Sequence, residues 1–276
     1  MFAIAVSVFA ASVAFAQSTI ASSEVNPFRL TATTATVVPD DDGGDLELSD
    51  AAPPPAVTIA PEPIAPEIRR TTFDWGGASN QSFFFLGIQH GFRMVQRKTR
   101  TQLDGQFFHD YANAVSGLGG WGDTDSVLTN YVGHPMMGAI TGFIQIQNDP
   151  KGLALEFDRN NSAYWRSRLK AMGWAAFYST QFEVGPISEA SIGNVGSKRG
   201  TMGYVDFVMT PVGGMGWIVA EDALDKHWIR KLEDGRSDGM KRFVRIFFNP
   251  NRSVANVLRF KKPWHRDTRS MSWDAN

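Results

Sequence analysis

Three side chains in this sequence could carry acid–base or metal chemistry: Glu183, Glu221 and His134. Glu183 ends a helical row of residues at steps of three and four, namely Trp165, Leu169, Met172, Ala176 and Ser179. Glu221 stands at helical spacing among Trp217, Leu224 and Trp228. Residues three and four apart share one face of an α-helix, so both carboxyl groups are expected to point into the protein. A buried carboxyl group must be paired, bound to a metal or protonated.

His134, directly before Pro135, and His90 are the natural partners of these carboxyl groups, and the further candidates are Glu189, Asp206, Asp222 and Arg166. Two interpretations are open. In one, His134 is an acid–base group or ligand in a polar pocket, with Glu183 and Glu221 as base or metal ligands. In the other, the same groups form ion pairs and caps that fix the register of the helices.

Known catalytic motifs do not decide between these interpretations. The sequence has no E-x-x-H pair, no H-E-x-x-H helix and no G-x-S-x-G elbow. Asp123-Thr124-Asp125 could contact a cation, but the complete calcium-loop pattern is absent, which favours a turn or helix cap. The cofactor and the metal, if any, therefore stay unknown.

The elements that position these residues are predicted to be helices. Apolar residues recur at helical spacing in about six segments between residues 70 and 235, which predicts a mainly α fold, a helical bundle. Residues 81–100 are apolar nearly all round, so this helix is expected to be central. Pro135 fits the first turn of a helix to about Gln147. Asn161 is expected to cap a long helix that Gly185 ends, and Thr210 with Pro211 to cap one running to Leu232.

Glycines recur on two of these helices. Gly138 and Gly142 form a G-x-x-x-G pair, and Gly213, Gly214 and Gly216 fall within one turn. Glycine inside a helix costs up to about 1 kcal/mol, so such clusters predict that two backbones approach closely.

Composition excludes several classes of site and protein. The chain has 276 residues, is 43% hydrophobic and has a net charge of −1, which fits a globular core and excludes collagen-like, coiled-coil and wholly disordered proteins. Because it has no cysteine, it has no disulfide framework, thiolate zinc site, iron–sulfur cluster or cysteine nucleophile.

The first part of the chain reads as an export signal followed by a tether. Residues 1–16 are almost wholly apolar and end in Ala14-Phe15-Ala16, which predicts a signal peptide cleaved before Gln17. The alternative, a membrane anchor, is disfavoured because about 20 apolar residues are needed to span a bilayer. Residues 17–69 are rich in Pro and Asp and are expected to form a disordered acidic linker.

Positive charge gathers at the other end, in a basic aromatic segment over residues 236–276. Residues 236–269 hold ten Lys or Arg and two Asp. A helix over 238–248 places Met240, Phe243, Val244 and Phe247 on one side and Lys241, Arg242 and Arg245 on the other, with Lys261, Lys262 and Trp264 following. This pattern is typical of a helix lying at a membrane surface. Export disfavours nucleic acid as a partner. The alternative is a final helix whose apolar face packs on the bundle.

Three short motifs resemble those of an uncharacterised family of bacterial exported proteins of the cell envelope. They are an H-P-x-x-G helix from His134 to Gly138, an F-E-x-G-P-x-S-E segment from Phe182 to Glu189, and a T-P-x-G-G helix from Thr210 to Gly214. The resemblance implies a helical envelope protein and supplies no reaction.

Together, these features predict an exported protein, periplasmic or associated with a membrane of the cell envelope. Its expected role is binding or structural support at a membrane surface. The expected partner is an anionic membrane surface or another envelope component, and the oligomeric state is left open. The alternative is an enzyme that acts on a lipid or envelope substrate through His134, Glu183 and Glu221.

Overall fold

The computed structural model describes residues 71–95, 107–123, 125–191 and 202–269. All regular elements in these ranges are helices, and none is a strand, so the prediction of a mainly α helical bundle is confirmed. No helix of the described ranges combines the length and apolar character needed to cross a bilayer. The predicted signal peptide and linker lie outside the described residues.

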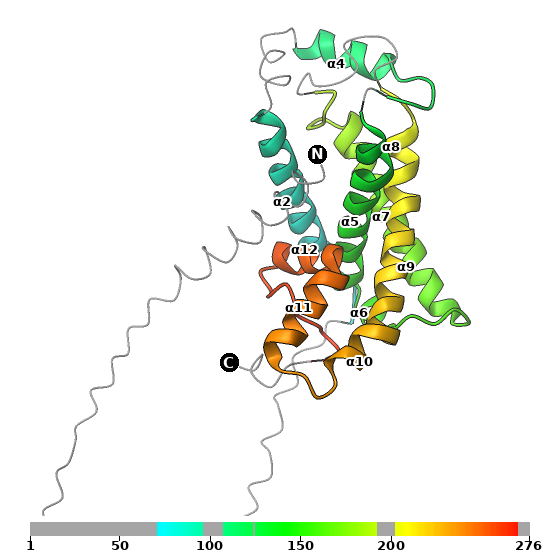
Figure 1. The fold of residues 1–276 in the computed structure, drawn as a ribbon. Coiled ribbons are helices and arrows are strands. Elements are labelled where there is room, and N and C mark those ends of the chain that lie inside the picture. The colour runs from blue at the N-terminus through cyan, green and yellow to red at the C-terminus, as the bar shows by residue number, and fades with distance from the viewer. Residues whose placement is uncertain (1–70, 96–106, 124, 192–201, 270–276) are drawn as a thin grey trace, which may run out of the picture. The chain divides into compact units, whose positions relative to one another are not determined.

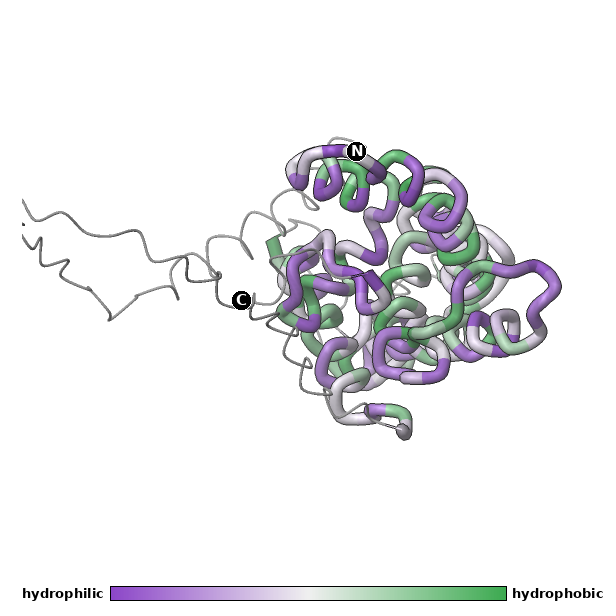
Figure 2. Tube along the Cα trace, turned by 90° about the horizontal axis from the view of Figure 1, so that it is seen from below, coloured by the Kyte–Doolittle hydropathy of each residue, from purple (hydrophilic) through white to green (hydrophobic). Residues whose placement is uncertain are grey.

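Helix α5 (His134–Asn148) is the centre of the bundle, and nearly all of its residues are buried. Helices α7 (Ser162–Val184) and α9 (Gly214–Leu224) pack along it, and α2 (Trp75–Met94) and α12 (Pro250–Leu258) pack against its other sides (Figure 1). The hydrophobic core forms where these helices meet, around Phe143, Ile144 and Ile218. Figure 2 shows the same bundle from below, with hydrophilic stretches on the outer loops.

Residues that the sequence singled out set the ends of α7, but not the start of the helical run that contains α5. Pro135 lies in the first turn of α5, but the π-helical turn η1 (Thr129–Gly133) runs directly into it, so Pro135 stands within a continuous helical run. The side chain of Asn161 accepts hydrogen bonds from the backbone of Ala163 (2.9 Å) and Tyr164 (3.4 Å) at the start of α7, and Gly185 ends that helix. The two predicted ends of α7 are confirmed, whereas the helical run that contains Pro135 begins before it.

The expectation that the helix at 81–100 is central is wrong. Helix α2 begins at Trp75, after Asp74 caps it by accepting from the N–H of Gly77 (3.0 Å), and it lies at the side of the bundle (Figure 1). It buries only one face, while Phe84, Ile88 and Phe92 are exposed. An apolar helix becomes central only if neighbours cover all its sides, whereas α2 contacts α5, α7 and α12 and leaves its remaining side in solvent.

The helix expected to begin at Thr210 starts earlier. One helical run comprises α8 (Val205–Val208), a π-helical turn η2 (Met209–Gly213), α9, a second π-helical turn η3 (Asp225–Ile229) and α10 (Arg230–Glu233). Thr210 and Pro211 lie inside η2 rather than at a cap. The wider π turn lets the helix pass through Pro211, which has no N–H to donate. A similar turn, η1 (Thr129–Gly133), leads into α5.

The predicted close approach of two backbones is confirmed at the crossing of α5 with this run. A Cβ atom at Gly138 would lie 1.7 Å from the carbonyl oxygen of Thr210, and one at Gly214 would lie 2.6 Å from the carbonyl carbon of Gly138. Only glycine therefore fits these two positions.

The remaining helices complete the two ends of the bundle. They are α4 (Phe107–Ser116), α6 (Pro150–Leu153) and α11 (Asp238–Phe248). Helix α11 occupies the predicted range, and the sequence did not predict α12 after it.

Candidate functional sites

Three buried side chains from three helices meet at one end of α5. His134 is the first residue of α5, Glu183 lies in the last turn of α7, and Asp206 lies in α8. One donor atom of each lies within 4.8 Å of those of the other two. We call these residues the triad. The structure thus brings together His134 and Glu183, as the sequence predicted, and adds Asp206, which the sequence offered as a further candidate.

Hydrogen bonds leave part of the triad unsatisfied. His134 Nε2 lies 3.3 Å from Asp206 Oδ1, and the other ring nitrogen of His134, Nδ1, lies 3.3 Å from the hydroxyl of Thr210. Within the described ranges, neither Glu183 Oε1 nor Asp206 Oδ1 takes part in a hydrogen bond, and both are buried. Buried oxygens of this kind are rare in folded proteins, because each costs about 1–3 kcal/mol.

Burial shifts the pKa of each of the three groups in the direction that favours its uncharged form. Burial, together with the positive charge of Arg93, lowers the pKa of His134 to about 4. Burial and the hydrogen bond and charge of Asp123 raise the pKa of Asp206 to about 9. The pKa of Glu183 is raised well above its ordinary value by burial and then by the carboxylates of Glu189 and Asp206.

More acidic groups surround the triad. Arg93 from α2 forms an ion pair with Glu189 and lies 4.0 Å from Asp125. Asp123 accepts hydrogen bonds from the side chain of Asn130 (2.7 Å) and the backbone of Asp125 (2.9 Å), which confirms the predicted turn. Five carboxyl groups thus face one guanidinium among the described residues: Asp123, Asp125, Glu183, Glu189 and Asp206. The roles of Arg93 and Asn130 were not predicted from the sequence, because nothing in their spacing marks them as neighbours of His134.

The loop after α7 is held against the triad by His90. His90 Nε2 donates to the carbonyl of Ile187 (3.1 Å), and the ring stacks on Phe182. The backbone N–H of Glu189 donates to the carbonyl of Phe182 (2.8 Å), which brings this loop back over the end of α7. His90 therefore positions the loop and is not a member of the triad.

Glu221 does not join His134 and Glu183, so the prediction of one cluster of these three residues is wrong. It lies eleven residues beyond Thr210 on the same helical run, about 16 Å along its axis. Its carboxylate accepts from the backbone N–H groups of Asn251 (2.9 Å) and Arg252 (3.1 Å), the free donors at the start of α12. Burial, only partly offset by these two hydrogen bonds, raises its pKa to about 7. Glu221 is a helix cap, as the structural interpretation expected.

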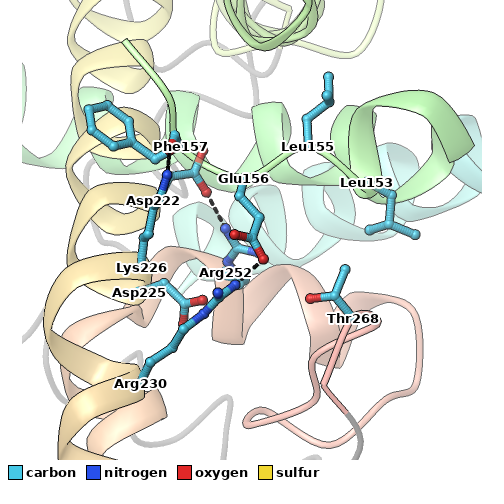
Figure 3. Close-up of a pocket in the computed structure, with 10 residues that line it drawn as sticks. All are labelled: Leu153, Leu155, Glu156, Phe157, Asp222, Asp225, Lys226, Arg230, Arg252 and Thr268. Carbon is cyan, nitrogen blue, oxygen red and sulfur yellow. Dashed lines mark hydrogen bonds and ion pairs between the residues drawn. The ribbon is translucent and has the colours of Figure 1, made fainter. Parts of the chain in front are cut away.

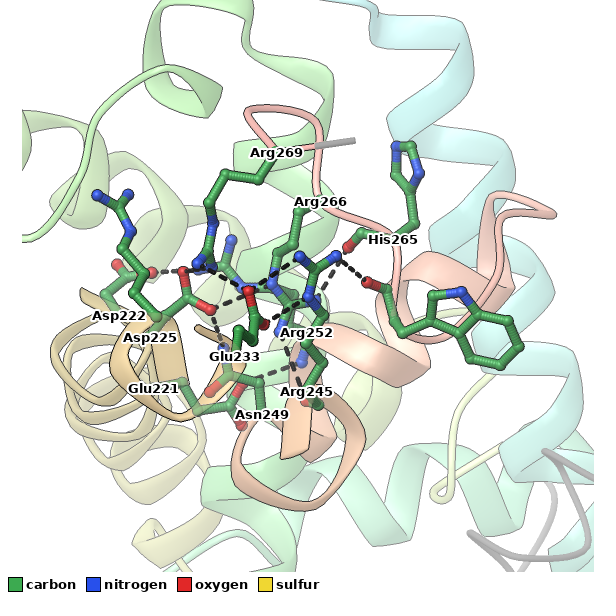
Figure 4. A network of polar contacts seen from close by, with 12 residues as sticks. Glu221, Asp222, Asp225, Glu233, Arg245, Asn249, Arg252, His265, Arg266 and Arg269 are labelled. Atoms are coloured by element: carbon green, nitrogen blue, oxygen red, sulfur yellow. Dashed lines mark hydrogen bonds and ion pairs between the residues drawn. The ribbon is translucent and has the colours of Figure 1, made fainter. Parts of the chain in front are cut away.

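An extensive network of ion pairs surrounds this cap (Figure 4). Asp222 accepts from Arg168 Nε (2.8 Å) and from the hydroxyl of Tyr164 (3.0 Å), and it also pairs with Arg252. Asp225 pairs with Arg266 and Arg269, and Glu233 pairs with Arg245 and Arg269. The network joins the helical run of α9 to the C-terminal segment.

A small polar cavity borders the network (Figure 3). Its volume is about 30 Å³, room for one or two water molecules. Glu156, Arg230, Asp222 and Arg252 line it, and Lys226 Nζ donates to the carbonyl of Phe157 (2.7 Å) beside it. Ion pairs of Glu156 with Arg230 and of Asp222 with Arg252 account for its charged lining.

Helix α11 turns its aromatic side, which a helix of a globular protein normally packs on the core, to solvent. Phe243 is 59% exposed, Phe247 is 64% exposed, and their rings stack with centroids 5.5 Å apart. Val244 and Arg245 face the protein instead. The alternative in which the Phe face packs on the bundle therefore does not describe this helix.

Arg245 was predicted to face a membrane, and this is wrong. It is only 3% exposed, and its guanidinium is held inside the protein. Nε donates to Glu233 Oε1 (2.6 Å), Nη2 to Glu233 Oε2 (3.1 Å) and Nη1 to the carbonyl of Trp264 (3.1 Å). The other predicted surface residues are partly or fully exposed, namely Lys241, Arg242, Lys261, Lys262 and Trp264. Arg242 covers the ring of Trp264 at 5.0 Å, which fixes the 259–264 segment beside α11.

Comparison of the chain with models of protein families, with curated protein sequences and with solved structures finds no match. Function must therefore be argued from the sites themselves.

Proposed function

We propose that this chain is an exported protein of the cell envelope that binds an anionic membrane surface through α11 and the segment after it. The observation that carries the proposal is the outward orientation of Phe243 and Phe247 while Arg245 is buried. A helix of this composition in water is expected to turn its aromatic side to the core. Stacked exposed rings next to basic side chains are typical of interfacial membrane helices.

Another exposed aromatic side chain follows α11 in the sequence. Phe260 is 83% exposed and stacks on Phe84 of α2, with ring centroids 6.1 Å apart. Lys261 and Lys262 follow it and are exposed. Aromatic rings with lysines beside them match the chemistry of a lipid surface, where rings enter the headgroup region and lysines contact phosphates.

The structure revises how much electrostatic attraction to expect. Among the described residues, six of the ten basic residues in 236–269 form ion pairs within the protein: Lys241, Arg245, Arg252, Arg259, Arg266 and Arg269. These charges are largely neutralised. Membrane binding is therefore expected to rest more on Phe243, Phe247 and Phe260 than on net charge, and to persist at high salt.

The double variant Phe243→Ser/Phe247→Ser tests this proposal. Burial of one Phe side chain contributes about 1.5–3 kcal/mol, so losing two should weaken vesicle binding at least about 100-fold. Binding is measured by cosedimentation of the full chain with vesicles of phosphatidylcholine and phosphatidylglycerol at low and high salt. Lys261→Gln/Lys262→Gln should remove mainly the salt-dependent part.

Phe177→Ser is the matched control, because Phe177 on α7 is 70% exposed and lies outside this surface. It should bind vesicles like the parent. The midpoint of thermal unfolding should change little in either Phe variant, since the rings are in solvent. Unchanged binding by the double variant would contradict the proposal. So would a parent that binds no vesicles and forms a dimer that the double variant abolishes, because the face would then be a contact between copies.

Export is a separate expectation with its own measurement. The mature protein should begin at Gln17, because Ala14 and Ala16 place small residues at the cleavage positions. N-terminal sequencing of protein from the envelope fraction checks this. Recovery of an intact Met1 from the cytosol would contradict it.

A further inference from the structure

We infer that His134, Glu183 and Asp206 form a binding site for one divalent transition-metal ion. The first observation is geometric. Ligands of one metal ion at distances of about 2.0–2.2 Å lie roughly 3–4 Å apart. The donor atoms of the triad lie within 4.8 Å of one another, so small rotations of the side chains bring them to that spacing.

The second observation is that one oxygen of each carboxyl group of the triad is buried without a hydrogen bond, while Asp206 is also hydrogen-bonded to Asp123. Glu183 is only 4% exposed and Asp206 5%, yet Glu183 Oε1 and Asp206 Oδ1 make no hydrogen bond to any residue the structure describes. A cation between them would satisfy both oxygens at once.

Charge supports a divalent ion. A metal ion binds carboxyl groups in their deprotonated form, so it would displace the protons of Glu183 and Asp206. Two carboxylates and one neutral imidazole then carry a charge of −2, which an ion of +2 neutralises in the buried site. Arg93 already pairs with Glu189, and of the described residues it is the one guanidinium in the group around the triad. One imidazole nitrogen with two carboxylate oxygens suits Zn²⁺, Mn²⁺ or Fe²⁺ better than Ca²⁺ or Cu⁺.

Thr210 supplies the outer support that metal-bound histidines require. A ligating histidine usually donates its second ring N–H to an acceptor, which fixes the ring orientation. With Nε2 on the metal, His134 Nδ1 can donate to the Thr210 hydroxyl, which lies 3.3 Å away. Two of the three π-helical turns in the described residues adjoin the site: η1 ends at Gly133, before His134, and η2 holds Thr210. Such turns are frequent at functional sites.

The test is Zn²⁺ binding by the full chain after treatment with a chelator. Competition with a chromophoric chelator should give one tightly bound ion per chain. Glu183→Gln and Asp206→Asn keep the side-chain shape and should each weaken Zn²⁺ binding at least about 100-fold, as should His134→Asn. Thr210→Val should weaken it about 10-fold. Co²⁺ binding provides a second measurement, because the visible spectrum of bound Co²⁺ in each of these variants should differ from that in the parent.

Glu221→Gln is the matched control, since Glu221 is as buried as Glu183 but caps α12, away from the triad. It should bind Zn²⁺ within about threefold of the parent. Glu183→Gln retains shape, and a thermal unfolding scan without metal shows whether it is folded, so weak binding can be assigned to the lost ligand. The inference is overturned if the parent binds no Zn²⁺ more tightly than the exposed histidines do, or if the triad variants bind it as well as Glu221→Gln.

Discussion

Asp222→Asn is expected to lower the free energy of unfolding by about 3–5 kcal/mol, because it removes one charge of a buried ion-pair network. Asp222 is buried and accepts from Arg168 (2.8 Å) and Tyr164 (3.0 Å) while also pairing with Arg252. Asn keeps the shape but leaves the Arg168 guanidinium, which is 1% exposed, without its counter-charge. For a domain of this size the unfolding midpoint should fall by about 6–20 °C. Urea and thermal unfolding of the full chain measure both values.

The control for this prediction is an ion pair at the surface. Glu156 pairs with Arg230, and both side chains are substantially exposed. Glu156→Gln should therefore cost no more than about 1 kcal/mol. A double variant with Arg168→Met and Asp222→Asn should lose less than the two single variants together, because it removes both members of the pair. If Asp222→Asn behaves like Glu156→Gln, the network does not stabilise the fold as argued.

The network also shows what the sequence could not predict. The helical spacing correctly predicted that Glu221 is buried, but not its partners, which are backbone N–H groups of α12, thirty residues later. Arg245 looked like a surface residue because a helical wheel places it opposite the Phe side. Its partner Glu233 lies in the preceding helix, so only the tertiary fold shows that this charge is inside. Long-range pairs between helices leave no periodic trace in a sequence.

The sequence was more informative where the cause is local. Asn161 and Gly185 mark the two ends of α7 through their own side-chain or backbone chemistry, and the structure places those ends there. The meeting of His134 with Glu183 was predicted from helix faces. Asp206 completes the triad because η2 continues the helix of Val205 through Pro211, whereas the sequence indicated that a helix begins there.

Gly138→Ala should destabilise the protein by about 3 kcal/mol or more, since its new methyl group would overlap backbone rather than a flexible side chain. The added Cβ would lie 1.7 Å from the carbonyl oxygen of Thr210, so α5 and η2 must move apart. At the same crossing, a Cβ added by Gly214→Ala would lie 2.6 Å from the carbonyl carbon of Gly138. This substitution should also lower the free energy of unfolding. Chemical denaturation of the full chain measures the loss.

Two other helical glycines provide controls of opposite sign. A Cβ at Gly216 on α9 or at Gly173 on α7 would have no atom within 4 Å. Alanine there should stabilise the protein by up to about 1 kcal/mol, because it favours the helix without a clash. If Gly138→Ala and Gly173→Ala have the same effect, the two helices do not approach as closely as described.

Because the hydroxyl of Thr210 orients His134, Gly138→Ala should also weaken Zn²⁺ binding in chains that remain folded, whereas Gly216→Ala should not. A single methyl group at this crossing thus tests the packing of the bundle and the support of the metal site together.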